Sequence, residues 1–352
     1  MTLPRPTGPY QVGVEDVYLV DHARPDPWNP PQPYRELMIS VVYPARGDVS
    51  AFKRAPLMTS GVSDGFNALA APGNYGITGI TVDWSSIATY EHVGAPVAAG
   101  RHPVVLYSPG AGDVRSWDSV LVDQLASEGY VVITIDPTYE ASAVQFPGTP
   151  NPRIVTSNLL SWYAKAKQAG TVPAFLKELV DTRVADTEFV LASLPTLPDG
   201  LSGAVDRRRI GMFGQSAGGF TALSAMYQDP RIRAGIDMDG TLEYTDGDPS
   251  DQNFSPVAQH GLSSPFLLLG SDEKGACTAA DDPSCAAVLK NSKGWHAALA
   301  LPGTGHGSFT DAEVLLPQLG VAGGIGSTPP ATVLAEEETI ISGFFGATLA
   351  SP

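Results

Sequence analysis

The feature that most constrains the fold is an alternation that begins at Pro103 and continues almost to the end of the chain. Short apolar runs alternate with longer stretches of helical spacing, which is typical of a parallel sheet flanked by helices. Six runs have the length of buried strands: Val104–Tyr107, Tyr130–Ile135, Arg209–Phe213, Ala234–Met238, Pro265–Leu269 and Trp295–Leu301. Helices are expected at Ser116–Ser127, Ala174–Ser193, Ala217–Tyr227, Cys285–Asn291 and Ala331–Phe345. We therefore predict an α/β fold with a mostly parallel central sheet covered on both faces.

The domain organisation follows from the continuity of this alternation. No shift in composition divides it, so one domain over residues 1–352 is predicted. Because residues 1–35 are rich in proline, which disfavours helices and central strands, they are predicted to form an extended arm. A strand is expected at Glu36–Tyr43, whereas residues 45–101 show little periodicity. Residues 141–172 interrupt the alternation beyond a strand end, and they are interpreted either as a cap over a binding crevice or as an ordinary surface excursion.

Charge and hydropathy limit the classes of partner. The formal net charge of −16 argues against nucleic acid and anionic membrane surfaces, because both are negatively charged. No apolar run reaches the roughly 18 to 20 residues that a membrane helix needs, and so no transmembrane segment is expected. The oligomeric state has no signature in the sequence.

The two cysteines bear on the compartment. Cys277 and Cys285 lie in the polar segment Gly275–Cys285, which is interpreted as one exposed loop. An even number at this spacing predicts a small disulfide ring and favours a secreted protein, the alternative being two free thiols in a cytoplasmic one. No charged-then-apolar leader precedes Thr2, which fits either a signal peptide already removed or none.

The motif Gly-x-Ser-x-Gly, which places a nucleophilic serine on a sharp strand-to-helix turn, occurs twice. Ser216 in Gly214–Gly218 follows a predicted strand and precedes a predicted helix. Ser63 in Gly61–Gly65 has neither neighbour and leads only to a short alanine-rich stretch. The sequence context therefore favours Ser216 as the nucleophile and an ordinary helix N-cap serine is the competing interpretation.

A serine hydroxyl needs a histidine to remove its proton and an acid to orient that histidine. His306 lies in the glycine-rich turn Gly303–Phe309 beyond the last predicted strand, and it fits the chain order serine, acid, histidine. Four other histidines lie before the alternation, at a strand start or inside a strand, and are interpreted as structural: His22, His92, His102 and His296. His260 is predicted in a loop before a strand begins, which is the wrong end for a catalytic histidine.

The acid has two candidates on the evidence of position. Asp239 and Asp272 each lie just past a predicted strand, and neither is clearly preferred by topology. Asp237 lies two residues deeper in its strand than Asp239 and is interpreted as buried or structural.

An oxyanion hole requires two backbone N–H donors. The residue after the nucleophile, Ala217, is expected to supply one. The glycine-rich turn Ser108–Gly112 follows an early strand, and Ala111 within it is the natural second donor. A phosphate-binding loop is the competing interpretation of this turn, but no Gly-Lys-Ser/Thr follows.

Together these residues resemble the plasma-type platelet-activating-factor acetylhydrolase family and its bacterial lipase-like relatives among the α/β-hydrolases. The matching segments are Pro6–Gly13, Val42–Pro44, Pro103–Gly112, Leu125–Tyr130, Gly214–Gly218 and His306–Asp311. The resemblance implies an α/β-hydrolase fold, Asp239 rather than Asp272 as the acid, and action without a metal. The chain departs from many relatives at Pro109–Gly110, where they have His-Gly.

We accordingly expect a serine carboxylic ester hydrolase that cleaves lipid-like or other hydrophobic acyl esters through an acyl-Ser216 intermediate, with His306 as base and Asp239 orienting it. A polyester hydrolase or amidase with the same triad, and a catalytically inactive protein that keeps the fold, are the alternatives. No cofactor is expected. The acidic run Asp246–Asp251 lacks the full calcium-loop pattern and is interpreted as a solvated turn, and the cysteines lack the partners of a zinc site.

Overall fold

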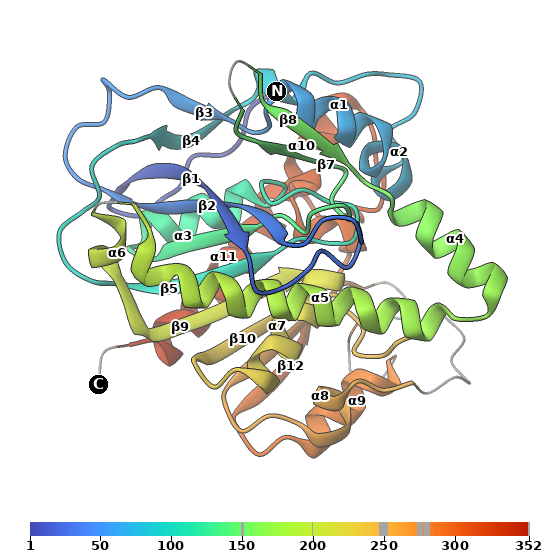
Figure 1. Cartoon of the computed structure of the whole chain (residues 1–352). Coiled ribbons are helices and arrows are strands. Elements are labelled where there is room, and N and C mark those ends of the chain that lie inside the picture. Colours follow the sequence, from blue (N-terminus) through green and yellow to red (C-terminus); the bar gives the residue numbers. More distant parts are fainter. Residues whose placement is uncertain (149–150, 199, 246–252, 273–276, 278–281, 351–352) are drawn as a thin grey trace.

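A large central sheet organises the molecule (Figure 1). The computed structural model describes residues 1–148, 151–198, 200–245, 253–272, 277 and 282–350. Within these ranges ten strands pair in the order β12-β11-β10-β9-β5-β6-β2-β1-β4-β3. The strands are β1 (Gln11–Asp21), β2 (Arg35–Ala45), β3 (Arg54–Pro56), β4 (Ala88–Val93), β5 (His102–Ser108), β6 (Val131–Ile135), β9 (Val205–Gln215), β10 (Ile232–Met238), β11 (Phe266–Gly270) and β12 (His296–Ala300).

The six strands predicted from the alternation form one parallel block, β12-β11-β10-β9-β5-β6. Each observed strand overlaps its predicted range and differs only by a few residues at its ends. Strand β2 then adds antiparallel to β6, and β1 adds antiparallel to β2. The predicted fold class, a mostly parallel sheet flanked by helices, is therefore confirmed.

Helices cover both faces of the sheet. Strand β5 shows why, because Val104 and Leu106 pack in the core beneath α5 (Val172–Ser193) and α7 (Ala217–Gln228). Val105 and Tyr107 alternate with them and pack on the other face, beneath α3 (Ser119–Ser127) and α11 (Pro330–Thr348). Figure 1 shows α5 crossing the near side of the sheet while α3 and α11 lie behind it. No helix in the described ranges is long and apolar enough to cross a membrane.

Shorter helices connect the layers. They are α1 (Ser60–Ala68), α2 (Ala70–Tyr75), α4 (Leu159–Ala169), α6 (Leu201–Ala204), α8 (Pro256–His260), α9 (Pro283–Asn291) and α10 (Ala312–Leu319), with 3₁₀ turns at Trp84–Ser86, Leu194–Thr196 and His306–Phe309. Residues 45–101, in which no element was predicted, hold α1, α2, β3 and β4, whose apolar positions are too few in a row to reveal a period.

The prediction of an extended arm over residues 1–35 is wrong. Eleven of these residues form β1, which pairs with β2 from Gln11–Ala45 through Asp21–Arg35. The physical reason is that the prolines lie on either side of this segment, so that every β1 residue keeps the N–H group that a ladder needs.

Residues 141–172 form a hairpin and a helix. Strands β7 (Ala143–Phe146) and β8 (Arg153–Thr156) pair antiparallel, and α4 follows them. The hairpin packs on α1, and Trp162 of α4 stacks on Trp28 at 4.7 Å between ring centroids. The interpretation of this segment as a cap stays a prediction.

The predicted disulfide joins Cys277 and Cys285, whose Cα atoms lie 5.6 Å apart. The prediction that both lie in an exposed loop is wrong, because both cysteines are buried. Cys285 lies in the first turn of α9, which Asp282 caps by accepting hydrogen bonds from the backbone N–H groups of Ser284 and Cys285. An apolar disulfide packed in the core explains the burial.

Candidate active site

Ser216 lies on a strand-to-helix turn, as its sequence context predicted. It follows β9 and precedes α7, and its backbone has φ 57° and ψ −122°. Its N–H donates to the carbonyl of Met238 at 2.8 Å. A Cβ atom on Gly218 would lie 1.9 Å from the carbonyl oxygen of Ser108, so only glycine lets the turn pack this closely on the end of β5. Ser216 and Ala217 are half-buried and reach solvent.

The second Gly-x-Ser-x-Gly serine lies in a different setting. Ser63 is buried inside α1, and its hydroxyl accepts a hydrogen bond from the Trp84 N–H at 3.2 Å. This hydroxyl therefore holds the chain that follows α2, and Ser63 lies within a helix rather than on a strand-to-helix turn. His260, predicted in a loop, instead ends helix α8.

His306 and Asp239 meet although 67 residues separate them. His306 begins the 3₁₀ turn after β12, and its Nδ1 lies 2.6 Å from Asp239 Oδ2. Asp239 follows β10 with φ 58°, and its Oδ1 accepts the Ser271 N–H at 2.8 Å. Burial alone would raise the pKa of the Asp239 carboxyl, but the hydrogen bond and charge of His306, helped by Ser271, hold that pKa below its usual value.

The two other acids considered from the sequence have backbone partners. Asp272 Oδ2 accepts the Gly303 N–H at 3.1 Å, which ties the end of β11 to the turn after β12. Asp237 is buried, and its Oδ1 accepts the Gly240 N–H at 2.9 Å. Both therefore hold turns near the site.

Gln215, the residue before Ser216, determines the tautomer of His306. Its amide nitrogen lies 3.1 Å from the His306 carbonyl oxygen and 3.0 Å from His306 Nε2. Because the carbonyl can only accept, the amide group facing it is the NH₂ donor, and Nε2 must then accept as well. The imidazole proton consequently lies on Nδ1, where it can be donated to Asp239, and the lone pair of Nε2 faces the turn that carries the serine.

The loop after β5 lies beside this turn. Ala111 is half-buried, and its carbonyl accepts a hydrogen bond from the Asn74 side-chain amide at 3.0 Å. Asn74 also donates to Asp113, as does the Tyr75 hydroxyl at 2.8 Å. Burial raises the pKa of the Asp113 carboxyl to about 6, although these two donors oppose the shift. Gly110 packs against the Gln215 side chain, where a Cβ would lie 2.4 Å from its amide oxygen.

Three side chains at the site have no part in the sequence predictions. Gln215 is the variable position of the motif, Asn74 comes from the segment without periodicity, and Arg183 of α5 reaches the loop from the side. Arg183 does carry a signal, because it lies four residues after Leu179 and seven before Val190, on the apolar face of its helix.

Metal ligation was the remaining possibility for the site. Among the residues that the structure describes, no group of three or more His, Cys, Asp or Glu side chains could hold a metal ion. The acidic run Asp246–Asp251 lies outside the described residues.

No family model matches the chain, whereas comparison with individual proteins gives matches, among them the following three. A protein of Arthroderma benhamiae named probable 1-alkyl-2-acetylglycerophosphocholine esterase is 29% identical over 347 residues, covering 92% of this chain and 80% of that one. The platelet-activating factor acetylhydrolase of Cavia porcellus is 25% identical over 181 residues, 47% of this chain and 39% of its own. The solved structure of a ferulic acid esterase from Streptomyces cinnamoneus is 30% identical with a TM-score of 0.77, covering 100% of this chain and 94% of that one.

Proposed function

We propose a catalytic triad for this chain, which belongs to the esterases of the α/β-hydrolase fold and is a carboxylic ester hydrolase. The proposed triad consists of Ser216, His306 and Asp239. The observation that carries the proposal is the 2.6 Å contact between Asp239 Oδ2 and His306 Nδ1. Gln215 supports it, because this neighbour of Ser216 contacts the same imidazole through Nε2. The order serine, acid, histidine is that of the nucleophile-elbow enzymes.

The proposed reaction proceeds through an acyl-enzyme. Ser216 Oγ attacks the ester carbonyl carbon while His306 Nε2 takes the hydroxyl proton, and the tetrahedral oxyanion is held by the N–H groups of Ala111 and Ala217. Collapse breaks the bond to the alcohol, which leaves with the proton from Nε2. Water then attacks the acyl-serine by the same steps and releases the carboxylic acid. Asp239 stays ionised throughout, in keeping with its lowered pKa.

The proposed substrates are esters of hydrophobic acyl groups. Leu69 and Leu159 each have a side-chain carbon within 4 Å of the place where a Cβ on Gly112 would lie, so that apolar groups border the proposed oxyanion loop. The names of the matched proteins offer two acyl classes to compare, the acetyl group of an alkyl-acetyl phospholipid and the feruloyl group. We propose the lipid-like ester first and the phenolic ester second, the latter because that structure matches the whole chain.

The proposal also covers the compartment and the domain count. A disulfide inside the core is stable in oxidising surroundings, which supports secretion of this chain. The parallel block β12-β11-β10-β9-β5-β6 shares one sheet with β2 and β1, which supports a single domain.

The experiment is replacement of the nucleophile. Ser216→Ala should lower hydrolysis of a chromogenic short-chain ester by at least about 10³-fold, because residual catalysis would come only from the oxyanion hole and binding. A fluorophosphonate probe should label the wild-type chain at Ser216 and leave the variant unlabelled. Ser63→Ala is the matched control and should keep full labelling. Activity that survives in Ser216→Ala would refute the triad, and a panel of acetyl, longer acyl and feruloyl esters then ranks the substrate classes.

A further inference from the structure

The guanidinium group of Arg183 is fully buried and every one of its N–H groups has an acceptor. Nε donates to Glu140 Oε2 at 2.8 Å, and Nη2 donates to the other oxygen of the same carboxylate. Nη1 donates to the Ser108 hydroxyl at 3.1 Å and to the Pro109 carbonyl at 2.5 Å, and Nη2 also donates to the Gly110 carbonyl at 3.2 Å. Five donors thus meet five acceptors.

Three of these acceptors belong to consecutive residues that lead directly to Ala111. The carbonyl of Gly110 and the N–H of Ala111 are parts of the same peptide unit, which is planar and trans. A donor that fixes the Gly110 carbonyl therefore also fixes the Ala111 N–H, which points to the opposite side of that plane. The Asn74 contact with the Ala111 carbonyl holds the next peptide in the same way.

One hydrogen bond within the loop holds the Gly110 carbonyl, which accepts the Asp113 N–H at 3.2 Å. Pro109 lacks an N–H group and Gly110 carries no side chain, so neither can add a hydrogen bond in that way, and additional restraint comes from outside the loop. Arg183 adds this restraint from α5 by donating to both carbonyls, and Glu140 supplies the charge that makes a buried guanidinium tolerable.

We infer that Arg183 is a positioning residue for the oxyanion hole: by binding the Pro109 and Gly110 carbonyls it orients the Ala111 N–H before the substrate arrives. The inference rests on the proposed function, because it assigns Arg183 a part in the reaction of Ser216. Lysine cannot replace it, because an ammonium has three donors at one point and cannot span two carbonyls, a hydroxyl and a carboxylate.

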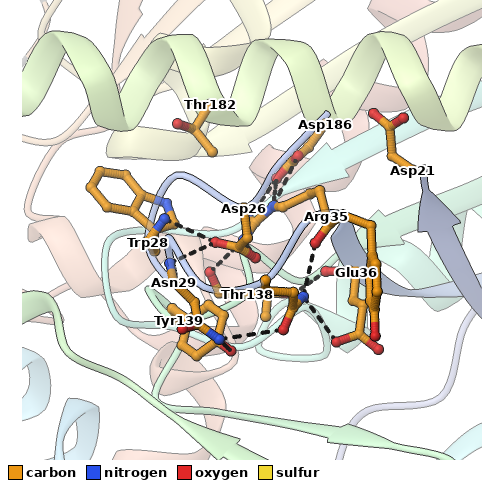
Figure 2. A network of polar contacts seen from close by, with 12 residues as sticks. Asp21, Asp26, Trp28, Asn29, Arg35, Glu36, Thr138, Tyr139, Thr182 and Asp186 are labelled. Carbon is orange, nitrogen blue, oxygen red and sulfur yellow. Dashed lines mark hydrogen bonds and ion pairs between the residues drawn. The ribbon is translucent and has the colours of Figure 1, made fainter. Parts of the chain in front are cut away.

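The chain offers a matched control in Arg35, which Figure 2 shows among its partners. Arg35 is also fully buried, also pairs with a carboxylate, in this case that of Asp186 at 2.8 Å, and also donates to a backbone carbonyl, that of Thr138 at 3.1 Å. Its donors go to these groups and to Asp26, and not to Ser108, Pro109 or Gly110. Arg35→Lys therefore imposes a similar loss of buried contacts without touching the oxyanion loop.

The experiment compares kcat and KM of Arg183→Lys and Arg35→Lys on a soluble chromogenic ester. The concentration of active sites, by which kcat is calculated, is determined by complete labelling with a fluorophosphonate. Arg183→Lys should lower kcat by about tenfold to a hundredfold with KM within about twofold, because only the transition state carries the oxyanion. Arg35→Lys should keep kcat within about twofold, although both variants melt at a lower temperature than the wild type.

Each other outcome has a defined meaning. Unchanged kcat in Arg183→Lys, a change in KM alone, or equal loss of kcat in both variants would overturn the inference. If Arg183→Lys does not fold, Glu140→Gln replaces it: the arginine then stays but loses half of its anchor, and kcat should fall by about threefold to tenfold at constant KM. A wild-type chain that the probe does not label at Ser216 defeats the proposed function itself, whereas labelling with unaltered kcat in both Arg183→Lys and Glu140→Gln defeats only the positioning role.

Discussion

Replacing Asp239 by asparagine tests whether Asp239 is the acid of the triad, because the change alters which nitrogen of His306 carries the proton. The Ser271 N–H needs an acceptor, so the amide oxygen should take the place of Oδ1 and the NH₂ group that of Oδ2, 2.6 Å from His306 Nδ1. Two donors would then face each other. The imidazole can relieve this only by moving its proton to Nε2, where it no longer has a lone pair for the Ser216 hydroxyl and meets the Gln215 amide donor-to-donor.

The wrong tautomer removes the base while leaving the fold in place. We expect kcat to fall on the order of 10⁴-fold, which is the size of the loss when the acid of a serine triad becomes an amide. This corresponds to about 5.5 kcal/mol of transition-state stabilisation. The assay is kcat for a chromogenic ester at neutral pH, with circular dichroism to show that the variant is folded.

Asp272→Asn is the matched control. Asp272 accepts a backbone N–H from Gly303 through one oxygen, and an asparagine oxygen can accept the same bond. Its kcat should stay within about twofold of the wild type. The reasoning is refuted if Asp239→Asn keeps more than about a tenth of the wild-type kcat, or if Asp272→Asn is the variant that loses it.

Two further predictions concern stability. Cys277→Ala together with Cys285→Ala should lower the free energy of unfolding by about 2.5 kcal/mol, the loop-closure entropy for cysteines 8 residues apart, and urea denaturation that gives less than about 1 kcal/mol would contradict it. The wild-type free energy of unfolding should fall as pH rises from about 4 to about 7, because burial raises the pKa of Asp113 and Asp311 to about 6 and that of Asp123 to about 7. In that pH range the folded chain binds more protons than the unfolded one, and each unit of pKa shift changes the free energy of unfolding by about 1.4 kcal/mol. A free energy of unfolding that stays constant or rises from about pH 4 to about pH 7 would be evidence against these shifts.

The sequence predicted the parts of the fold that carry their own periodicity. Strands buried on both faces appear as unbroken apolar runs, and so Val131–Ile135 could be recognised without knowledge of its neighbours. β1 was missed because composition was averaged over residues 1–35, which hid the proline-free segment that contains this strand of 11 residues. The cysteines were placed in an exposed loop because the residues around them are polar, although a capped helix takes Cys285 into the core.

The residues of the candidate site also include some that the sequence predicted and some that it did not. Ser216 and His306 were identified from local motifs and their order along the chain. Arg183 and Asn74 were not, because they bind backbone carbonyls, and a carbonyl is the same in every residue type. The partners of Arg183 lie 43 and 73 to 75 residues away, so no local pattern relates them. Contacts of this kind become visible only when the chain is folded.

The left-handed backbone conformations of Ser216 and Asp239 create a conflict between thermal stability and activity. A non-glycine residue in this conformation costs the folded state on the order of 1 kcal/mol, and glycine at the same place would not incur that cost. Selection for heat resistance alone would therefore gain from Ser216→Gly, the change that removes the nucleophile. Laboratory evolution of this chain toward higher melting temperature has to screen for turnover in every round, because at this position the two goals call for different residues.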